Sequence, residues 1–166
     1  MPIKAADGRY EPLKLEMRRR MSSAIARKLK IIWVDEIMFT KSTNLSHEWS
    51  KRTTNVHIPC EAMGTKYTAV IAAISEGCGF EHIELHGEGI NESLFSAFLY
   101  NLHAINKDKK VVIVMDNLKA HKTDTIMRQL KMLKIEWIFN VPYSPEYNAI
   151  ELPFGQVKKR FKELKL

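Results

Sequence analysis

The feature that most constrains the fold is an unbroken apolar run, Val111–Met115 (VVIVM), which ends directly at Asp116. A short continuous run of this kind, rich in β-branched residues, is typical of a strand that is buried on both faces of a sheet. Such a sheet needs helices on its two faces. Residues 91–104, which start with Asn91, and residues 124–133 both have the apolar spacing of amphipathic helices. These segments together predict a layered α/β domain.

Further strands and one more helix complete the predicted order. Strands are expected at residues 31–40 (IIWVDEIMFT), 67–75 (YTAVIAAIS), 80–86 and 135–141 (IEWIFNV), with a shorter one near residues 47–52. Residues 150–164 repeat apolar side chains at spacings of four and three, which predicts a helix with its basic residues on the opposite side. The order matches an RNase H-like fold, a mixed five-stranded sheet flanked by helices.

Length and composition fit one intracellular domain. A chain of 166 residues is long enough to bury a single core of ordinary size. No apolar run approaches the roughly 20 residues of a membrane span, and the N-terminus lacks the apolar core of a secretory signal. Cys60 and Cys78 lack the CxxC spacing of a metal or redox motif, so we expect both to be reduced packing residues.

The first 30 residues differ from the rest of the chain. They contain no strand-like run, and residues 13–30 predict a basic helix. We therefore divide the chain into residues 1–30, a basic N-terminal segment or linker remnant, and residues 31–166, the α/β domain. The basic helix either touches DNA or is simply solvated.

Positive charge is concentrated in three parts of the chain. The formal net charge is +7 and the sequence pI is about 9.4. Clustered lysine and arginine residues are expected of a protein that binds a polyanion, although a solvated basic surface is a common alternative. The clusters are Arg18, Arg19, Arg20, Arg27, Lys28 and Lys30; Lys107, Lys109 and Lys110; and Lys158, Lys159, Arg160 and Lys162.

Three acidic residues are candidates for a functional site because of their positions in the predicted strands and helix. Asp35 lies inside the apolar strand 31–40, where an ionised carboxylate is costly without a cation or hydrogen-bond donors. Asp116 follows the buried run at its carboxyl end, where α/β folds usually place ligand sites. Glu151 opens the last helix. Each has an ordinary alternative: a solvent-facing acid at a strand end, a turn residue, or a glutamate that favours the helix dipole.

Taken together, the two strand-borne aspartates and the helix-borne glutamate predict a metal site. Carboxylate oxygens suit Mg²⁺ or Mn²⁺ and not zinc. Two such ions activate a nucleophilic oxygen and stabilise the leaving oxygen in attack on a phosphodiester. His121, five residues after Asp116, is either a group that supports this site or an ordinary residue at a helix start.

The motifs around these acids resemble those of mariner-superfamily transposases. The shared blocks are WVDE at residues 33–36, VMDNLKAH at 114–121, SPEYNAIE at 144–151 and FGQVK at 154–158. Residues 117–150, 34 in all, separate Asp116 from Glu151, which is the separation in the D,D,34E signature of that superfamily. Ala149 and Pro153 depart from the pattern of many relatives, which puts the start of the last helix in doubt.

The resemblance implies an RNase H-like catalytic domain that cuts and joins DNA with two Mg²⁺ or Mn²⁺ ions. It gives Asp35 the role of bridging both metals, and Asp116 and Glu151 the role of completing one site each. It further implies supporting positions at Asn117 and His121, and contacts with DNA phosphate at Lys158, with Lys159 and Arg160 beside it. The expected partners are transposon ends and target DNA, a homodimer is allowed, and the location is nuclear or otherwise intracellular.

Other functions remain open from the sequence alone. Residues 1–30 are too short for the paired helix-turn-helix modules that such transposases carry, so a fragment, an isolated catalytic domain or a decayed copy is expected. The main alternative is a domesticated protein that binds nucleic acid or protein without cleaving. A nuclease acting on RNA–DNA hybrids fits the spacing less well, and a Rossmann-like domain lacks its GxGxxG loop.

Overall fold

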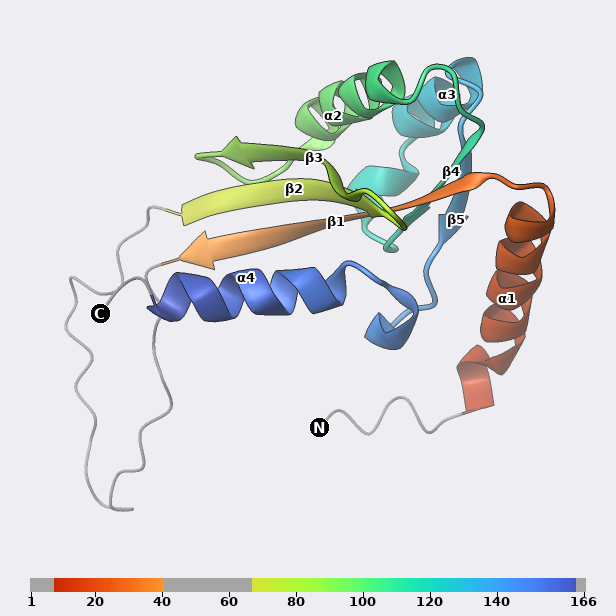
Figure 1. Cartoon of the computed structure of the whole chain (residues 1–166), viewed down its shortest axis with the longest axis horizontal. Coiled ribbons are helices and arrows are strands. Elements are labelled where there is room, and N and C mark those ends of the chain that lie inside the picture. The colour runs from red at the N-terminus through yellow and green to blue at the C-terminus, as the bar shows by residue number, and fades with distance from the viewer. Residues whose placement is uncertain (1–7, 41–66, 164–166) are drawn as a thin grey trace.

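A mixed sheet organises the chain in a computed structural model, which describes residues 8–40 and 67–163 (Figure 1). The five strands of these ranges have the order β3-β2-β1-β4-β5. β1 pairs antiparallel with β2, and β2 with β3, while β1, β4 and β5 run parallel to one another. The strands are β1 (Lys30–Thr40), β2 (Tyr67–Ser75), β3 (Gly79–His86), β4 (Val111–Met115) and β5 (Glu136–Phe139). The predicted strand near residues 47–52 lies outside the described residues.

Helices cover both faces of this sheet, as predicted. Figure 1 shows α2 and α3 on one side of the sheet and α4 on the other side, alongside β1. α1 lies near the end of the sheet where β1 begins. Asn91 caps α2 by accepting a hydrogen bond from the backbone N–H of Leu94 at 3.0 Å, which confirms the predicted start signal. The helices are α1 (Glu11–Ala26), α2 (Glu92–Ile105), α3 (Asp124–Met132) and α4 (Glu151–Glu163), and short 3₁₀ turns are η2 (Gly8–Tyr10), η5 (Lys119–Lys122) and η6 (Pro145–Tyr147).

Side chains from alternate strand positions fill the core on the two faces. Ile32 and Val34 of β1 pack with Phe95 and Phe98 of α2 on one face. On the other face the core has two parts. One lies under α1 and the other under α4, and Trp33 packs against both. Every residue of β4 is buried, as its apolar run predicts.

Two neighbouring parallel strands, β1 and β4, place the two predicted aspartates at one edge of the sheet. β1 and β4 run parallel and pair as far as Val34 opposite Met115. β4 ends there, whereas β1 continues to Thr40. Asp35 and Asp116 are the next residues on the two strands, so the parallel register brings the two aspartates to the same edge.

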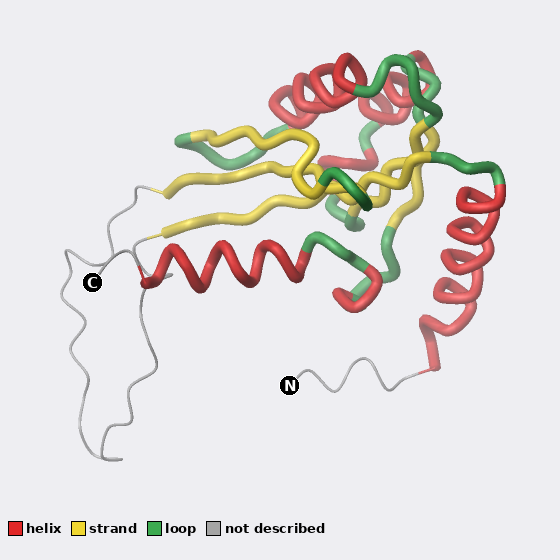
Figure 2. The backbone as a smooth tube through the Cα atoms, viewed as in Figure 1, coloured by secondary structure: helices red, strands yellow, loops and turns green. Residues whose placement is uncertain are grey.

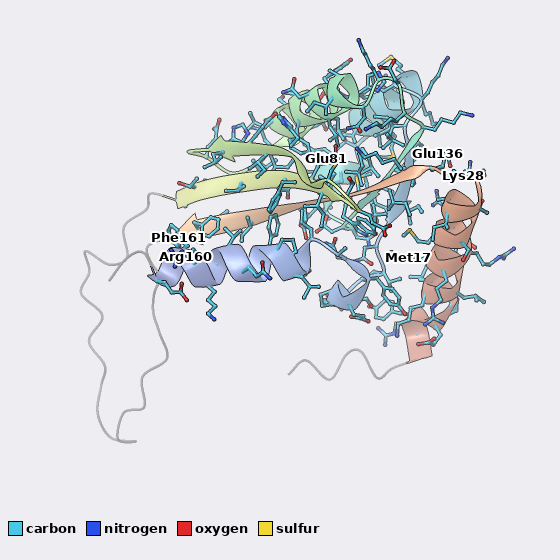
Figure 3. The ribbon with its side chains drawn as sticks, in the orientation of Figure 1. Met17, Lys28, Glu81, Glu136, Arg160 and Phe161 are labelled. Carbon is cyan, nitrogen blue, oxygen red and sulfur yellow. The ribbon has the colours of Figure 1, made fainter. Side chains whose placement is uncertain are left out.

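The basic N-terminal helix packs on the sheet. Met17 and Ala24 of α1 are buried beside Val114 and Ile138, and Met17 points from α1 toward the sheet (Figure 3). Arg27 forms a two-pronged pair with Glu136 of β5, at 2.7 and 2.8 Å. The division of the chain at residue 30 stays a prediction. None of the helices in the described ranges has both the length and the apolar character needed to span a bilayer.

One prediction about packing is wrong. Cys78 is free and exposed in the turn between β2 and β3, so it does not fill the core. Gly77 and Gly79 flank it with positive φ angles of 83° and 72°. A tight turn built on these glycines points the intervening side chain into solvent. Cys60 lies outside the described residues.

Candidate active site

The three predicted acids line one cleft of about 580 Å³ at the carboxyl end of β4. Asp35 comes from the middle of β1, Asp116 follows β4, and Glu151 is the first residue of α4. The connection from β5 to α4, which contains η6, forms another wall and runs between α4 and α1 (Figure 2). The fold thus brings together carboxylates that are separated by up to 116 positions in the sequence.

Asp35 is a carboxylate held in an unfavourable environment. Its Oδ1 accepts a hydrogen bond from the backbone N–H of Glu36 at 2.7 Å, and its Oδ2 accepts one from Asn148 Nδ2 at 2.8 Å. Burial raises the pKa of Asp35 to about 6, and the negative charges of Asp116, Glu151 and Glu36 raise it further, against the lowering effect of the Glu36 N–H. A carboxylate of this kind is stabilised in its ionised form by a nearby cation.

Asp116 differs because it has a positively charged neighbour. Its Oδ1 accepts the backbone N–H of Leu118 at 3.0 Å and lies 2.9 Å from His121 Nδ1. Burial alone would raise the pKa of Asp116, but His121, the Leu118 N–H and Lys122 together lower it. The contact with His121 is an ion pair more than a regular hydrogen bond, since Nδ1 makes no well-aligned bond. Asp116 is therefore kept ionised.

His121 is almost fully buried, at 1% exposure, and bridges two acids. Its Nε2 lies 2.9 Å from Glu36 Oε1, and its ring stacks on Phe95 with 4.0 Å between centroids. Burial opposes the charged form, but Asp116 and Glu36 outweigh it and raise the pKa of His121 to about 9. A protonated His121 then balances the two carboxylates at neutral pH.

Glu36 is a residue of the site that the sequence analysis did not single out. Successive strand residues point to opposite faces, so Asp35 lies on the α4 face and Glu36 on the α2 face. There Glu36 meets His121, while it also lines the cleft. The signal was present in the sequence as a second acid beside Asp35 within an apolar strand.

A network of asparagines fixes the loop that closes the cleft. Asn117 Nδ2 donates to the carbonyl of Asn140, and Asn140 Nδ2 donates to the carbonyl of Ser144 at 3.2 Å. Asn148 is 5% exposed and holds Asp35 through its Nδ2, as noted above. The predicted supporting residue Asn117 therefore acts on the loop. Asn140 and Asn148 were missed, because a buried asparagine in a loop leaves no periodic pattern.

The predicted DNA-binding residues separate on α4. Lys158 lines the cleft together with Glu151, from the same helix. Lys159 and Arg160 are exposed outside the cleft wall. Arg160 pairs with Glu163 at 3.2 Å and points away from the sheet, whereas Phe161 faces it and contacts Phe39 with 4.6 Å between ring centroids (Figure 3).

The cleft offers hard oxygen donors for a divalent cation. The three predicted acids line it together with Glu36 and with Asn148, whose Oδ1 is a buried oxygen without a hydrogen-bond partner. Within the described ranges, however, no three His, Cys, Asp or Glu side chains are already gathered as ligands of one ion. Glu151 is exposed on the first turn of its helix, so its side chain has the rotational freedom to move toward the two aspartates. The donor chemistry fits Mg²⁺ or Mn²⁺.

The contribution of Asp35 to the stability of the metal-free protein is expected to fall as the pH rises from about 3.8 to 6. The pKa of Asp35, about 6, lies above its ordinary value of 3.8, so in this window the folded state binds more protons than the unfolded state. A shift of this size corresponds to at most about 3 kcal/mol. Urea denaturation at several pH values measures the slope. Asp35→Asn should remove it and Asp108→Asn, at an exposed position, should not; equal slopes in all three proteins would contradict the assignment.

Fold and cleft together define an RNase H-like domain with an acidic site, and comparison with known proteins assigns its family. A sequence profile described as DDE superfamily endonuclease matches residues 30–166. The chain therefore belongs to the DDE superfamily of endonucleases. Curated protein sequences include no significant match.

Solved structures confirm the predicted RNase H-like fold. The catalytic domain of Mos1 mariner transposase superposes with a TM-score of 0.63 at 17% identity, over 96% of this chain and 74% of that one. Mos1 transposase in a paired-end complex with the left transposon end gives a TM-score of 0.67 at 16% identity, over 96% of this chain. This chain spans about half the length of that transposase, 49%.

Proposed function

We propose that this chain is the catalytic domain of a metal-dependent DNA transposase or endonuclease, which hydrolyses a phosphodiester bond and transfers a DNA strand. The observation that carries the proposal is the meeting of Asp35, Asp116 and Glu151 in one cleft. Water attacks the phosphodiester first and releases a 3′-hydroxyl, which then attacks the phosphodiester of the target DNA and displaces its 3′ oxygen.

The residues of the cleft fit two divalent ions in the roles that the family pattern suggests. The negative charges of Asp116 and Glu151 both act on Asp35. Asp35 would therefore help to hold both ions, while Asp116 and Glu151 would hold one each. When bound, Mg²⁺ or Mn²⁺ supplies charge stabilisation for the attacking and the leaving oxygen. Structures of the Mos1 catalytic domain contain Mg and Mn, which supports this choice of metals.

The protein groups around the acids prepare them for this role. His121 carries the positive charge that keeps Asp116 ionised, and Asn148 fixes one oxygen of Asp35. Carboxylate ligands whose partners hold them in place bind metal more tightly than free ones. We propose that His121 and Asn117 are positioning residues and not groups that touch DNA.

The partner in this proposal is DNA. Lys158 stands in the cleft wall, where its charge would neutralise a phosphate near the acids, and Lys159 and Arg160 would extend this contact along α4. Mos1 transposase has been solved with a left transposon end and as a strand transfer complex, which supports transposon ends and target DNA as substrates and allows a homodimer. Such an enzyme acts where DNA is held, inside the cell and, in a nucleated cell, in the nucleus.

We expect the chain to nick supercoiled plasmid DNA in Mg²⁺ or Mn²⁺ and to lose this activity on chelation. Because the bound ions activate the attacking oxygen and stabilise the leaving oxygen, chelation should bring nicking to background. Conversion of supercoiled to open-circular DNA on a gel measures the activity. Asp116→Ala should abolish it in both metals, since that variant lacks one of the three acids.

The same assay separates the proposal from its main alternative. A chain that binds DNA and the metal but does not nick would indicate a catalytic domain whose cleavage depends on a separate DNA-binding domain. A chain that binds DNA with no metal affinity and no nicking would overturn the proposal in favour of a domesticated binding protein. Isothermal titration with Mn²⁺ gives the metal affinity independently of cleavage.

A further inference from the structure

Tyr143 is an aromatic residue that the fold presents to the cleft in an unfavourable backbone conformation. It lines the cleft together with Asp35, Asp116 and Glu151, and 63% of its surface is exposed. Its φ angle is +56°, in the left-handed region that side chains bearing a Cβ rarely adopt. A bulky residue held in this region is a strained feature, and such features concentrate at functional sites.

The other two non-glycine residues with positive φ in the described ranges have a local reason that Tyr143 lacks. Lys28 and Lys134 each stand two positions after the last residue of a helix, α1 and α3. The residue that follows each of them donates its N–H to a carbonyl five positions earlier, at 3.0 Å for Leu29 and 2.9 Å for Ile135. This is the usual way to end a helix. Tyr143 follows Pro142 in the β5–α4 connection and ends no helix.

Buried neighbours hold the Tyr143 backbone in place. Val141 and Ser144, on either side of residues 142 and 143, are 3% and 5% exposed. The N–H of Val141 donates to Asn140 Oδ1 at 2.8 Å, and Ser144 Oγ donates to the carbonyl of Pro142 at 3.3 Å. The loop is thus anchored on both sides of Tyr143, whose side chain stays mostly exposed. An anchored loop with an exposed ring suits contact with a ligand better than packing.

We propose that the ring of Tyr143 is a stacking platform for a nucleotide base next to the phosphate that is cleaved. The inference rests on the proposed function, because it takes the ligand of the cleft to be DNA. Aromatic side chains bind bases of any sequence through their faces, and each such stack contributes substantially to binding of single-stranded DNA. A base stacked on Tyr143 leaves the duplex, which brings the adjoining phosphate within reach of the acids.

The surroundings of Tyr143 fit a nucleotide. The ring of Tyr10 lies 6.3 Å away at a 53° tilt, so the two rings do not stack face to face with each other. Arg18 of α1 donates to the hydroxyl of Tyr147 at 2.9 Å in the same loop, which places a guanidinium near this wall. Lys158 lines the cleft as well. Aromatic rings beside basic groups are the usual components of a surface that binds single-stranded nucleic acid.

The test is binding of a single-stranded DNA oligonucleotide that carries 2-aminopurine, measured with the full chain in the absence of divalent metal. Stacking on an aromatic ring quenches the fluorescence of 2-aminopurine. Wild type and Tyr143→Phe should quench it, whereas Tyr143→Ala should not and should bind roughly 5- to 100-fold more weakly. Lys158→Ala should weaken binding and keep the quench, because it removes a phosphate contact and leaves the ring.

Two further variants separate stacking from a structural role. Tyr143→Gly removes the ring and also relieves the backbone conformation, so its melting temperature should be no lower than that of Tyr143→Ala while the quench is lost. Tyr100→Ala, at an exposed tyrosine of α2 away from the cleft, should behave as wild type. A quench that survives in Tyr143→Ala, or that is lost in Tyr143→Phe, would overturn the inference.

The inference and the proposed function fail in different ways. Nicking by wild type together with an undiminished quench in Tyr143→Ala overturns the stacking role and leaves the endonuclease. A quench that depends on the ring, in a chain that neither binds Mn²⁺ nor nicks in Mg²⁺ or Mn²⁺, overturns the endonuclease and supports Tyr143 as a base-binding residue. Absence of any DNA binding by wild type overturns the stacking role as well.

Discussion

Replacing His121 by phenylalanine is expected to lower the free energy of unfolding by about 3–5 kcal/mol at pH 7, because it removes one partner from a buried set of charges. His121 lies between Glu36 and Asp116, at 2.9 Å from each. Phenylalanine keeps the aromatic contact with Phe95 but leaves the two carboxylates without their cation. Urea denaturation measures the change. His103→Phe, at a half-buried histidine of α2, is the matched control and should cost much less.

The stability that His121 provides should also depend on pH. The pKa of His121, about 9, lies above its ordinary value of 6.5, so its stabilising effect is complete below pH 6.5 and disappears as the pH rises through 9. The wild-type protein should therefore lose about 3 kcal/mol of stability between pH 6.5 and 9. The His121→Phe variant should show no such loss. A wild-type stability that stays constant over this range would mean that His121 is neutral in the folded protein.

Most of the fold could be predicted from the sequence because its signals are local. The continuous run Val111–Met115 predicted the buried strand β4 with its observed bounds, and the apolar spacing after Asn91 predicted α2. The last helix begins at Glu151, which accommodates Pro153 within its first turn, where backbone N–H groups need no helical partner. The exposure of Cys78 could not be predicted, since it depends on a turn that two glycines shape.

The cleft could be predicted only in part, because its geometry comes from long-range pairing. Asp35, Asp116 and Glu151 were predicted as a group from their positions at strands and a helix start, and the structure brings them to one cleft. The pairing of Glu36 with His121 crosses 85 positions of sequence and uses the face of β1 opposite to Asp35. No local pattern shows which histidine an acid on that face will meet.

Glu151→Gln is expected to reduce nicking by at least about 100-fold while changing the free energy of unfolding by no more than about 1 kcal/mol, the size of a helix-dipole effect. Even a group that only supports a metal ligand contributes about 10- to 100-fold, so the loss of a carboxylate that binds the ion should exceed this range. Glu151 is exposed, and its replacement by the isosteric amide removes charge without opening a cavity. Plasmid nicking in Mg²⁺ and Mn²⁺, together with urea denaturation, measures both properties.

A substitution of Glu151 tests the metal site more specifically than a substitution of either aspartate. Asp116 also holds His121, and Asp35 is half-buried with two hydrogen bonds, so variants at these positions change stability together with chemistry. Glu146→Gln, at an exposed acid five positions earlier in η6, is the matched control and should nick as wild type. If Glu151→Gln nicks as fast as Glu146→Gln, the third acid of the site lies elsewhere. If both variants lose activity alike, the effect comes from the overall charge near the cleft and not from metal binding.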